Sequence, residues 1–295
     1  MSAASTPLPS RGLLPAQVPM AATLPPHASS LILRANMAAD FKFFRRSRLI
    51  LAFVIVFVII TALSILPTLF GSSSFESFST LQQIFGELRV FLLILCGGLG
   101  LFLVSFHLRD RSLKMVFTKP CSPANWLAGA MLSAAAVSFL LNALIFAVMV
   151  VLSYAWHLSV RPGLFFLAFE SFVMSLVVIS FMAMLASLIH PAVAVTVAII
   201  FNGDLFYSFQ QWAMESIAAG NKSLSMRVIE DIFHALYMFL PMYAPYSRHT
   251  DTVESTYRVE PGQWKYLAFS LGYTLVFALF AYLIALLSLR RKRHI

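Results

Sequence analysis

Four polar residues interrupt long apolar stretches of this sequence and are the first candidates for chemistry: Asn142, Glu170, Asn202 and Asp204. An ionisable side chain inside a membrane is costly, so it marks a polar path, a proton site or a contact with another helix. Asp204 in particular must have a partner, water or a proton. We therefore treat these four residues as candidates for a substrate path. The alternative is that each is satisfied by a neighbouring helix or reaches the outer membrane surface.

Other combinations of reactive residues are weaker. Glu230 and His234 are four residues apart and would share a helix face, but two candidate ligands without a third do not predict a metal site. Cys96 and Cys121 have no metal-ligand spacing and form no disulfide framework. The sequence contains neither His-Glu-x-x-His nor Gly-x-Ser-x-Gly, and no span holds two carboxylates at helical spacing. We predict no catalytic residue and no metal site.

These residues belong to a chain in which 60% of the residues are hydrophobic and 11% are charged. A helix needs roughly 20 apolar residues to cross a bilayer, and six segments meet or approach that length: 49–69, 86–106, 126–156, 163–189, 191–214 and 265–289. The apolar blocks show no period of two, so they predict helices and not barrel strands. The predicted fold is an all-α membrane protein, a bundle of six transmembrane helices.

The remaining segments have distinct compositions. Residues 1–40 are rich in proline and predict a flexible tail before the membrane domain at 41–293. Residues 215–262 are too charged to cross and form an external segment. Within it, a helical stripe predicts an amphipathic helix on the outer leaflet, ended by Pro241; its members are Ile229, Ile232, Phe233, Leu236 and Leu240. Asn202, Gly203 and Asp204 predict a bent or weakened helix in the fifth span.

The formal net charge of +9 is distributed unevenly along the chain. If both termini are cytoplasmic, the inner segments hold 14 basic residues against two acids, and the outer segments hold seven against eight. This count includes Arg89 among the outer residues. Basic residues favour the cytoplasmic side, so we predict that both termini lie in the cytoplasm. The charge is therefore a topology signal and predicts no nucleic-acid partner.

The loop between the second and third spans, residues 107–125, predicts a short helix. Leu113, Val116 and Phe117 form one apolar stripe, and Pro120 ends the helix. Ser122 then predicts an N-cap with Pro123 at the first helical position of the next span. The helix could present itself to a cytoplasmic partner, or its basic residues could merely set the topology.

This loop resembles the one found in permeases of type-2 ATP-binding-cassette (ABC) transporters. In these, a charged segment is followed by an apolar turn, a Pro-x-Ser-like stretch and a glycine in span three. The corresponding residues are 109–113, 116–123 and Gly129.

Three further segments agree with this family in order. Residues 45–48 resemble its basic segment before span one, 187–192 its short connection between spans four and five, and 235–241 its Leu-Tyr-x-x-x-Pro stretch before the last span. The resemblance extends over about residues 30–293.

The resemblance implies an ABC exporter-like permease subunit in a bacterial inner membrane. It implies contact with a cytoplasmic ATPase subunit through Arg109, Asp110, Arg111, Leu113, Lys114, Val116, Phe117, Lys119 and Pro120. It also implies a homodimer or a pair of related permeases embedded in lipid. The chain has no Gly-x-x-x-x-Gly-Lys-Ser/Thr sequence, so ATP and Mg²⁺ belong to the partner and this chain is not itself an enzyme. The alternatives are an ion-gradient-driven transporter or channel, with Asp204 or Glu170 taking up a proton, and a membrane assembly factor that moves nothing.

Overall fold

The computed structural model describes residues 26–46, 51, 55–63, 78–109, 122–160, 162–200, 203–219, 224–241 and 261–292. Within these ranges the chain is helical and contains no strand. The helices are α1 (Pro26–Arg46), α3 (Phe78–Arg109), α5 (Pro123–Ala155), α6 (Pro162–Leu188), α7 (Pro191–Ile200), α8 (Gly203–Ala218), α9 (Leu224–Phe239) and α11 (Pro261–Lys292).

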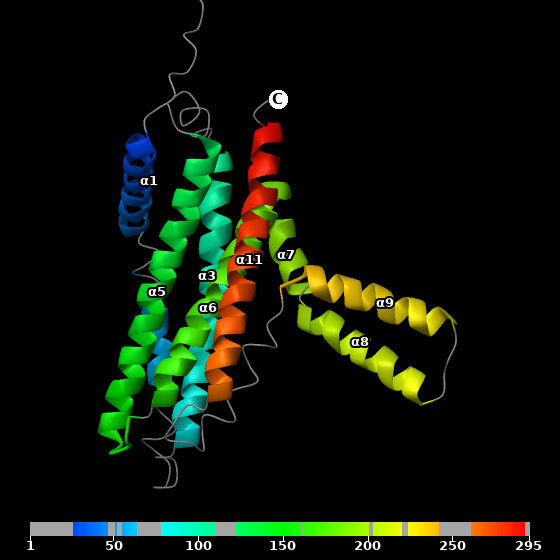
Figure 1. The fold of residues 1–295 in the computed structure, drawn as a ribbon. Helices are drawn as coiled ribbons and strands as arrows, with labels where there is room; N and C mark the ends of the chain where they lie inside the picture. The colour runs from blue at the N-terminus through cyan, green and yellow to red at the C-terminus, as the bar shows by residue number, and fades with distance from the viewer. Residues whose placement is uncertain are drawn as a thin grey trace, which may run out of the picture.

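Four long helices, α3, α5, α6 and α11, run side by side as a bundle, and α6 packs against the other three (Figure 1). By length and apolar composition, five segments of the described chain could cross a membrane: these four helices and residues 191–218. The prediction of an all-α membrane protein is confirmed to this extent. Most of the first predicted span, residues 49–69, lies outside the described residues, so the sixth span stays a prediction.

Small residues set the distance between α3 and α6. A Cβ atom added to Gly100 would lie 2.6 Å from the carbonyl oxygen of Ile179, and one added to Gly97 would lie 3.3 Å from Val178. Helices in lipid gain little from hydrophobic exclusion and associate by close packing, which such residues allow. Gly100 therefore fixes the closest approach of α3 to the backbone of α6.

The start of α5 has the local structure that the sequence predicts. Ser122 is extended, with φ −73° and ψ 145°, and its hydroxyl accepts a hydrogen bond from the Asn125 amide at 3.1 Å. Pro123 occupies the first turn, where no backbone donor is needed. The Tyr282 hydroxyl of α11 donates to the carbonyl of Ala124 at 3.1 Å. The first turn of α5 is thus capped locally and tied to α11.

The N-terminal region differs from the flexible tail predicted for residues 1–40, because residues 26–40 form most of α1. This helix packs on the first turns of α5, where Asn36 approaches Gly129 and the Ser133 hydroxyl donates to the Asp40 carboxylate at 3.2 Å. Phe44 is fully buried. Tertiary contacts of these polar and apolar side chains hold α1 in place. Residues 1–25 lie outside the described residues.

The fifth predicted span, residues 191–214, corresponds to two helices, and residues 201–202 between them lie outside the described residues. α7 has ten residues, or about 15 Å, which is half of a bilayer core. α8 begins at Gly203 and turns steeply away, so that α8 and α9 form a hairpin that projects sideways from the bundle (Figure 1). The change of direction between α7 and α8 agrees with the bend expected near residues 202–204, and the amphipathic helix expected in 215–262 corresponds to α9.

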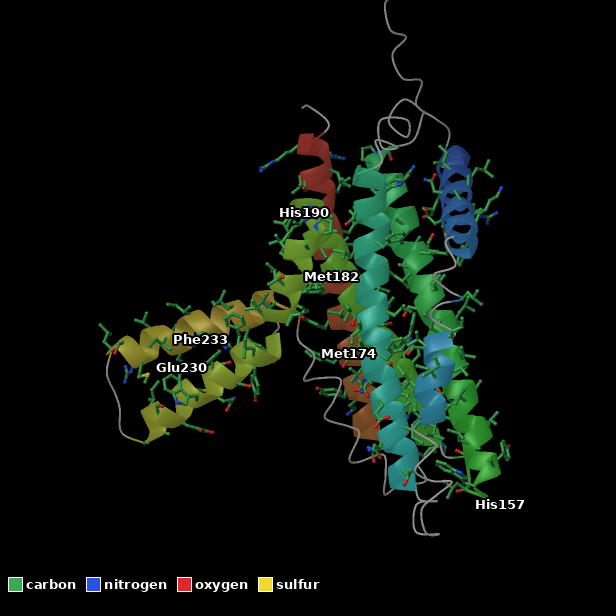
Figure 2. The ribbon with its side chains drawn as sticks, turned by 180° about the vertical axis from the view of Figure 1, so that it is seen from behind. His157, Met174, Met182, His190, Glu230 and Phe233 are labelled. Atoms are coloured by element: carbon green, nitrogen blue, oxygen red, sulfur yellow. The ribbon has the colours of Figure 1, made fainter. Side chains whose placement is uncertain are left out.

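The predicted cytoplasmic segments meet at one end of the bundle. α1, the end of α3, the start of α5 and the C-terminus all lie there (Figure 1). His190 lies near the same end and His157 at the opposite one (Figure 2). This gathering agrees with the inner segments of the charge analysis; the side of the membrane that this end faces stays a prediction.

Candidate functional site

A cluster of small polar side chains lies between α3, α5 and α6, and we call it the hydroxyl cluster. It consists of Cys96 from α3, Ser138 and Asn142 from α5, and Ser175 from α6, all of them buried. The Ser138 and Ser175 hydroxyls share a short hydrogen bond, and the Cys96 thiol donates to Ser138 at 3.4 Å. The cluster therefore joins three helices through one serine.

The backbone satisfies much of the remaining hydrogen-bonding capacity of the cluster. The Asn142 amide donates to the Ser138 carbonyl at 2.9 Å, and the Ser175 hydroxyl reaches the Phe172 carbonyl at 2.6 Å. Polar groups buried in a membrane need such partners. In these hydrogen bonds the Asn142 side chain finds its partner within its own helix. This agrees with the alternative that Asn142 is structurally satisfied and does not line a substrate path.

A basic and an acidic residue lie near the cluster, and we call Arg89 and Glu170 the Arg–Glu pair. Arg89 on α3 and Glu170 on α6 interact electrostatically, and their exposed fractions are 8% and 1%. The Arg89 guanidinium also donates to the Met174 sulfur at 3.1 Å. Met174 lies one helical turn after Glu170, so Arg89 spans one turn of α6.

The Arg–Glu pair lies inside the bundle and not at its surface. Glu170 is eight residues into α6, or about 12 Å from its start, and Arg89 is eleven residues into α3, or about 16 Å. Met174 lies between the two bundle ends that His157 and His190 mark (Figure 2). Arg89, which the charge analysis counted among the outer residues, is instead buried beside Glu170. Without Arg89, the outer segments hold six basic residues and not seven.

The structure places the three described residues of the predicted path on three different helices. Asn142 belongs to α5 and Glu170 to α6, whereas Asp204 lies in the first turn of α8, where the chain leaves the bundle. Asn202 lies outside the described residues. Of the residues expected to contact an ATPase, Arg109 is the last residue of α3, and the others lie within residues 110–121, outside the described part of the chain.

The hairpin of α8 and α9 is held by contacts between aromatic rings and by a polar pair. Phe233 of α9 stacks on Phe209 of α8, with centroids 5.2 Å apart, and also contacts Phe206. His234 shares a 2.9 Å hydrogen bond with Gln210. Among the described residues no group of three metal-binding side chains occurs.

Sequence reasoning missed Arg89, Ser138, Ser171 and Ser175 as members of this region. Two of the signals were present: Ser138 with Asn142 and Ser171 with Ser175 are each four residues apart and so share a helix face. The pairing of Arg89 with Glu170 required the true start of α3, eight residues before the predicted span at 86–106. An arginine next to an apolar block otherwise resembles an interfacial residue.

Comparison of the chain with protein-family models and with curated proteins found no match. The candidate site contains a buried acid and base and a hydroxyl cluster that bridges three helices. Such an arrangement can hold helices in register and exchange a proton, and its described residues contain no nucleophile with an adjacent base.

Proposed function

We propose that the chain is the membrane subunit of an ATP-binding-cassette exporter, driven by an ATPase on a separate polypeptide. The observation that carries the proposal is the order of four family-like segments along the chain, centred on the loop at 107–125. Five apolar segments provide a membrane domain. The absence of a phosphate-binding loop sequence leaves ATP hydrolysis to the partner.

The contacts around the start of α5 support a coupling role for that loop. The loop leads directly into Ser122, and the following turns of α5 bond to Tyr282 of α11 and to Asp40 of α1. A force on the loop would therefore act on three helices at once. Packed helices transmit such displacements because their side chains cannot deform continuously.

Co-purification tests the proposal most directly. The tagged full-length chain, extracted in a mild detergent, should retain a polypeptide that contains the Gly-x-x-x-x-Gly-Lys-Ser/Thr sequence and hydrolyses ATP. If several mild detergents yield the intact membrane chain without such a partner, the proposal is wrong.

Charge reversal in the loop tests the coupling contact. We expect Arg109→Glu with Arg111→Glu to release the ATPase or to uncouple hydrolysis from transport, because the charges would oppose the predicted contact. The matched control is Arg290→Glu with Arg291→Glu, the same change at exposed positions at the end of α11. Normal coupling in the loop variant would leave the loop as a determinant of topology alone.

A further inference from the structure

The Glu170 side chain is buried and incompletely hydrogen-bonded, and the coupling role proposed above does not explain this. The side chain is 1% exposed, and its Oε2 atom has no hydrogen-bond partner among the described residues. The hydroxyl of the adjacent Ser171, also 1% exposed, is equally without a partner in the described chain. Two consecutive residues of α6 thus bury polar atoms that the surrounding helices leave unsatisfied.

The charged environment of Glu170 comes from one neighbouring helix. α5 and α7, which pack on α6, contain no Asp, Glu, Lys or Arg, and α6 contains no other. α3 contributes Arg89, while its Glu87 is exposed and its Cys96 is bonded to Ser138.

α11 approaches α6 near the start of both helices. Its Trp264 contacts Phe166, one turn before Glu170, and the adjacent Lys265 is exposed and Tyr266 partly exposed. Among the described groups, Arg89 is the one whose charge acts on Glu170.

These surroundings can accommodate both the neutral acid and the carboxylate form of Glu170. A buried carboxylate is costly unless its oxygens accept hydrogen bonds and a cation lies close. The partnerless Oε2 fits the neutral acid better than the carboxylate. Arg89, already on the adjacent face of α3, can stabilise the carboxylate after the proton has left. A group with a partner for each form can exchange a proton without unfolding the helices around it.

We propose that Glu170 is a proton-binding site, neutral in the arrangement described here, and that Arg89 becomes the ion-pair partner of its carboxylate when the proton is released. In the release step, the carboxyl O–H bond breaks, the proton passes to water, and the electron pair stays on the carboxylate. Arg89 also bonds Met174, so its movement toward Glu170 would lengthen or break that contact. The site is independent of the proposed ATPase and adds a proton as a second ligand of the membrane domain.

Infrared spectroscopy of the full-length protein in lipid nanodiscs tests this site. The wild-type spectrum should contain the C=O stretching band of a protonated, buried carboxylic acid, and the band should decrease as the pH is raised. Glu170→Gln should remove it. Glu87→Gln is the matched control, because it changes an exposed acid on the neighbouring helix and should leave the band unchanged.

Several results would overturn the proposal. If Glu170→Gln leaves the carboxylic acid band in place, Glu170 is ionised throughout and the proposal is wrong. A band that persists undiminished to the pH at which the protein unfolds would show a permanently neutral acid and no exchange. If the Gln variant does not fold, Glu170→Asp keeps the acid and should shift the band in frequency; an unshifted band rejects the assignment. Each of these results leaves the co-purification test of the ATPase untouched.

Discussion

Ser138 is the residue through which three helices of the bundle share hydrogen bonds. Its hydroxyl contacts Ser175 of α6 and the Cys96 thiol of α3, while its carbonyl accepts from Asn142. In a membrane such interhelical bonds are individually modest, because the separated helices also find partners. These hydrogen bonds contribute mainly by fixing the rotation of each helix about its own axis, because the surrounding helix surfaces are largely apolar.

At this position we expect a measurable coupling between two hydroxyls. Ser138→Ala and Ser175→Ala should each lower the free energy of unfolding, and the double variant should lose less than the sum by about 0.6 kcal/mol, a typical interhelical value. Thermal unfolding in detergent is the measurement. Ser180→Ala is the control, because this buried hydroxyl of α6 bonds the Leu176 carbonyl of its own helix. Strict additivity of the first pair would contradict a direct bond.

At the scale of helices, the contact between α3 and α6 depends on the absence of a side chain at Gly100. A methyl group there would meet the Ile179 carbonyl oxygen at 2.6 Å, a contact with backbone that no rotamer change relieves. We expect Gly100→Ala to separate the helices and to cost about 1–3 kcal/mol in unfolding free energy. Differential scanning fluorimetry in detergent measures the shift.

Gly98 provides the matched control for that change. It lies on the same helix, and a Cβ atom added there meets nothing within 4 Å. Alanine favours a helix over glycine by up to about 1 kcal/mol, so Gly98→Ala should be neutral or stabilising. Equal losses in both variants would mean that glycine acts through the helix backbone and not through the contact with α6.

The docking of α1 on α5 is a second helix-scale contact that can be tested. Asp40 is 6% exposed and accepts from the Ser133 hydroxyl. Asp40→Leu removes the acceptor, so we expect faster amide hydrogen exchange over residues 26–46, measured by mass spectrometry. Asp40→Asn keeps an acceptor oxygen of similar shape and should protect α1 as the wild type does. Exchange in α1 that is fast already in the wild type would contradict the docking.

Local signals in the sequence are sufficient to predict several helix ends, but they do not predict which face of a helix packs against its neighbours. Ser122 with Pro123, Pro191 and Pro241 restrict the backbone directly, and the structure has helix boundaries beside each of them. α6, in contrast, carries apolar residues on every face and its few polar residues are spread along it, so its sequence does not indicate clearly which side meets α3. The burial of Arg89 and the direction in which α8 leaves α7 depend on tertiary packing. Both features are determined by contacts between residues that lie far apart in the sequence.

At the scale of the whole molecule, the long helices alternate in direction and bring distant basic segments to one end. The end of α3, the start of α5, α1 and the C-terminus gather there, and the turn between α5 and α6 lies at the other end (Figure 1). The bundle thus separates the charges of the chain along its axis. This separation follows from helix order alone, so it holds whichever way the first predicted span runs.

The orientation of the bundle in the membrane follows from that separation and is open to a labelling experiment. Basic residues favour the cytoplasmic side, so we expect Ser159→Cys, in the turn after α5, to react with an impermeant maleimide in intact cells. Arg291→Cys, at the end of α11, should react only after the cells are made permeable. Both positions are exposed, the background carries Cys121→Ser, and Cys96 stays as a buried internal control. The reverse pattern would invert the topology and place the loop at 107–125 outside, where no ATPase could reach it; equal labelling of both positions in intact cells would contradict a single orientation.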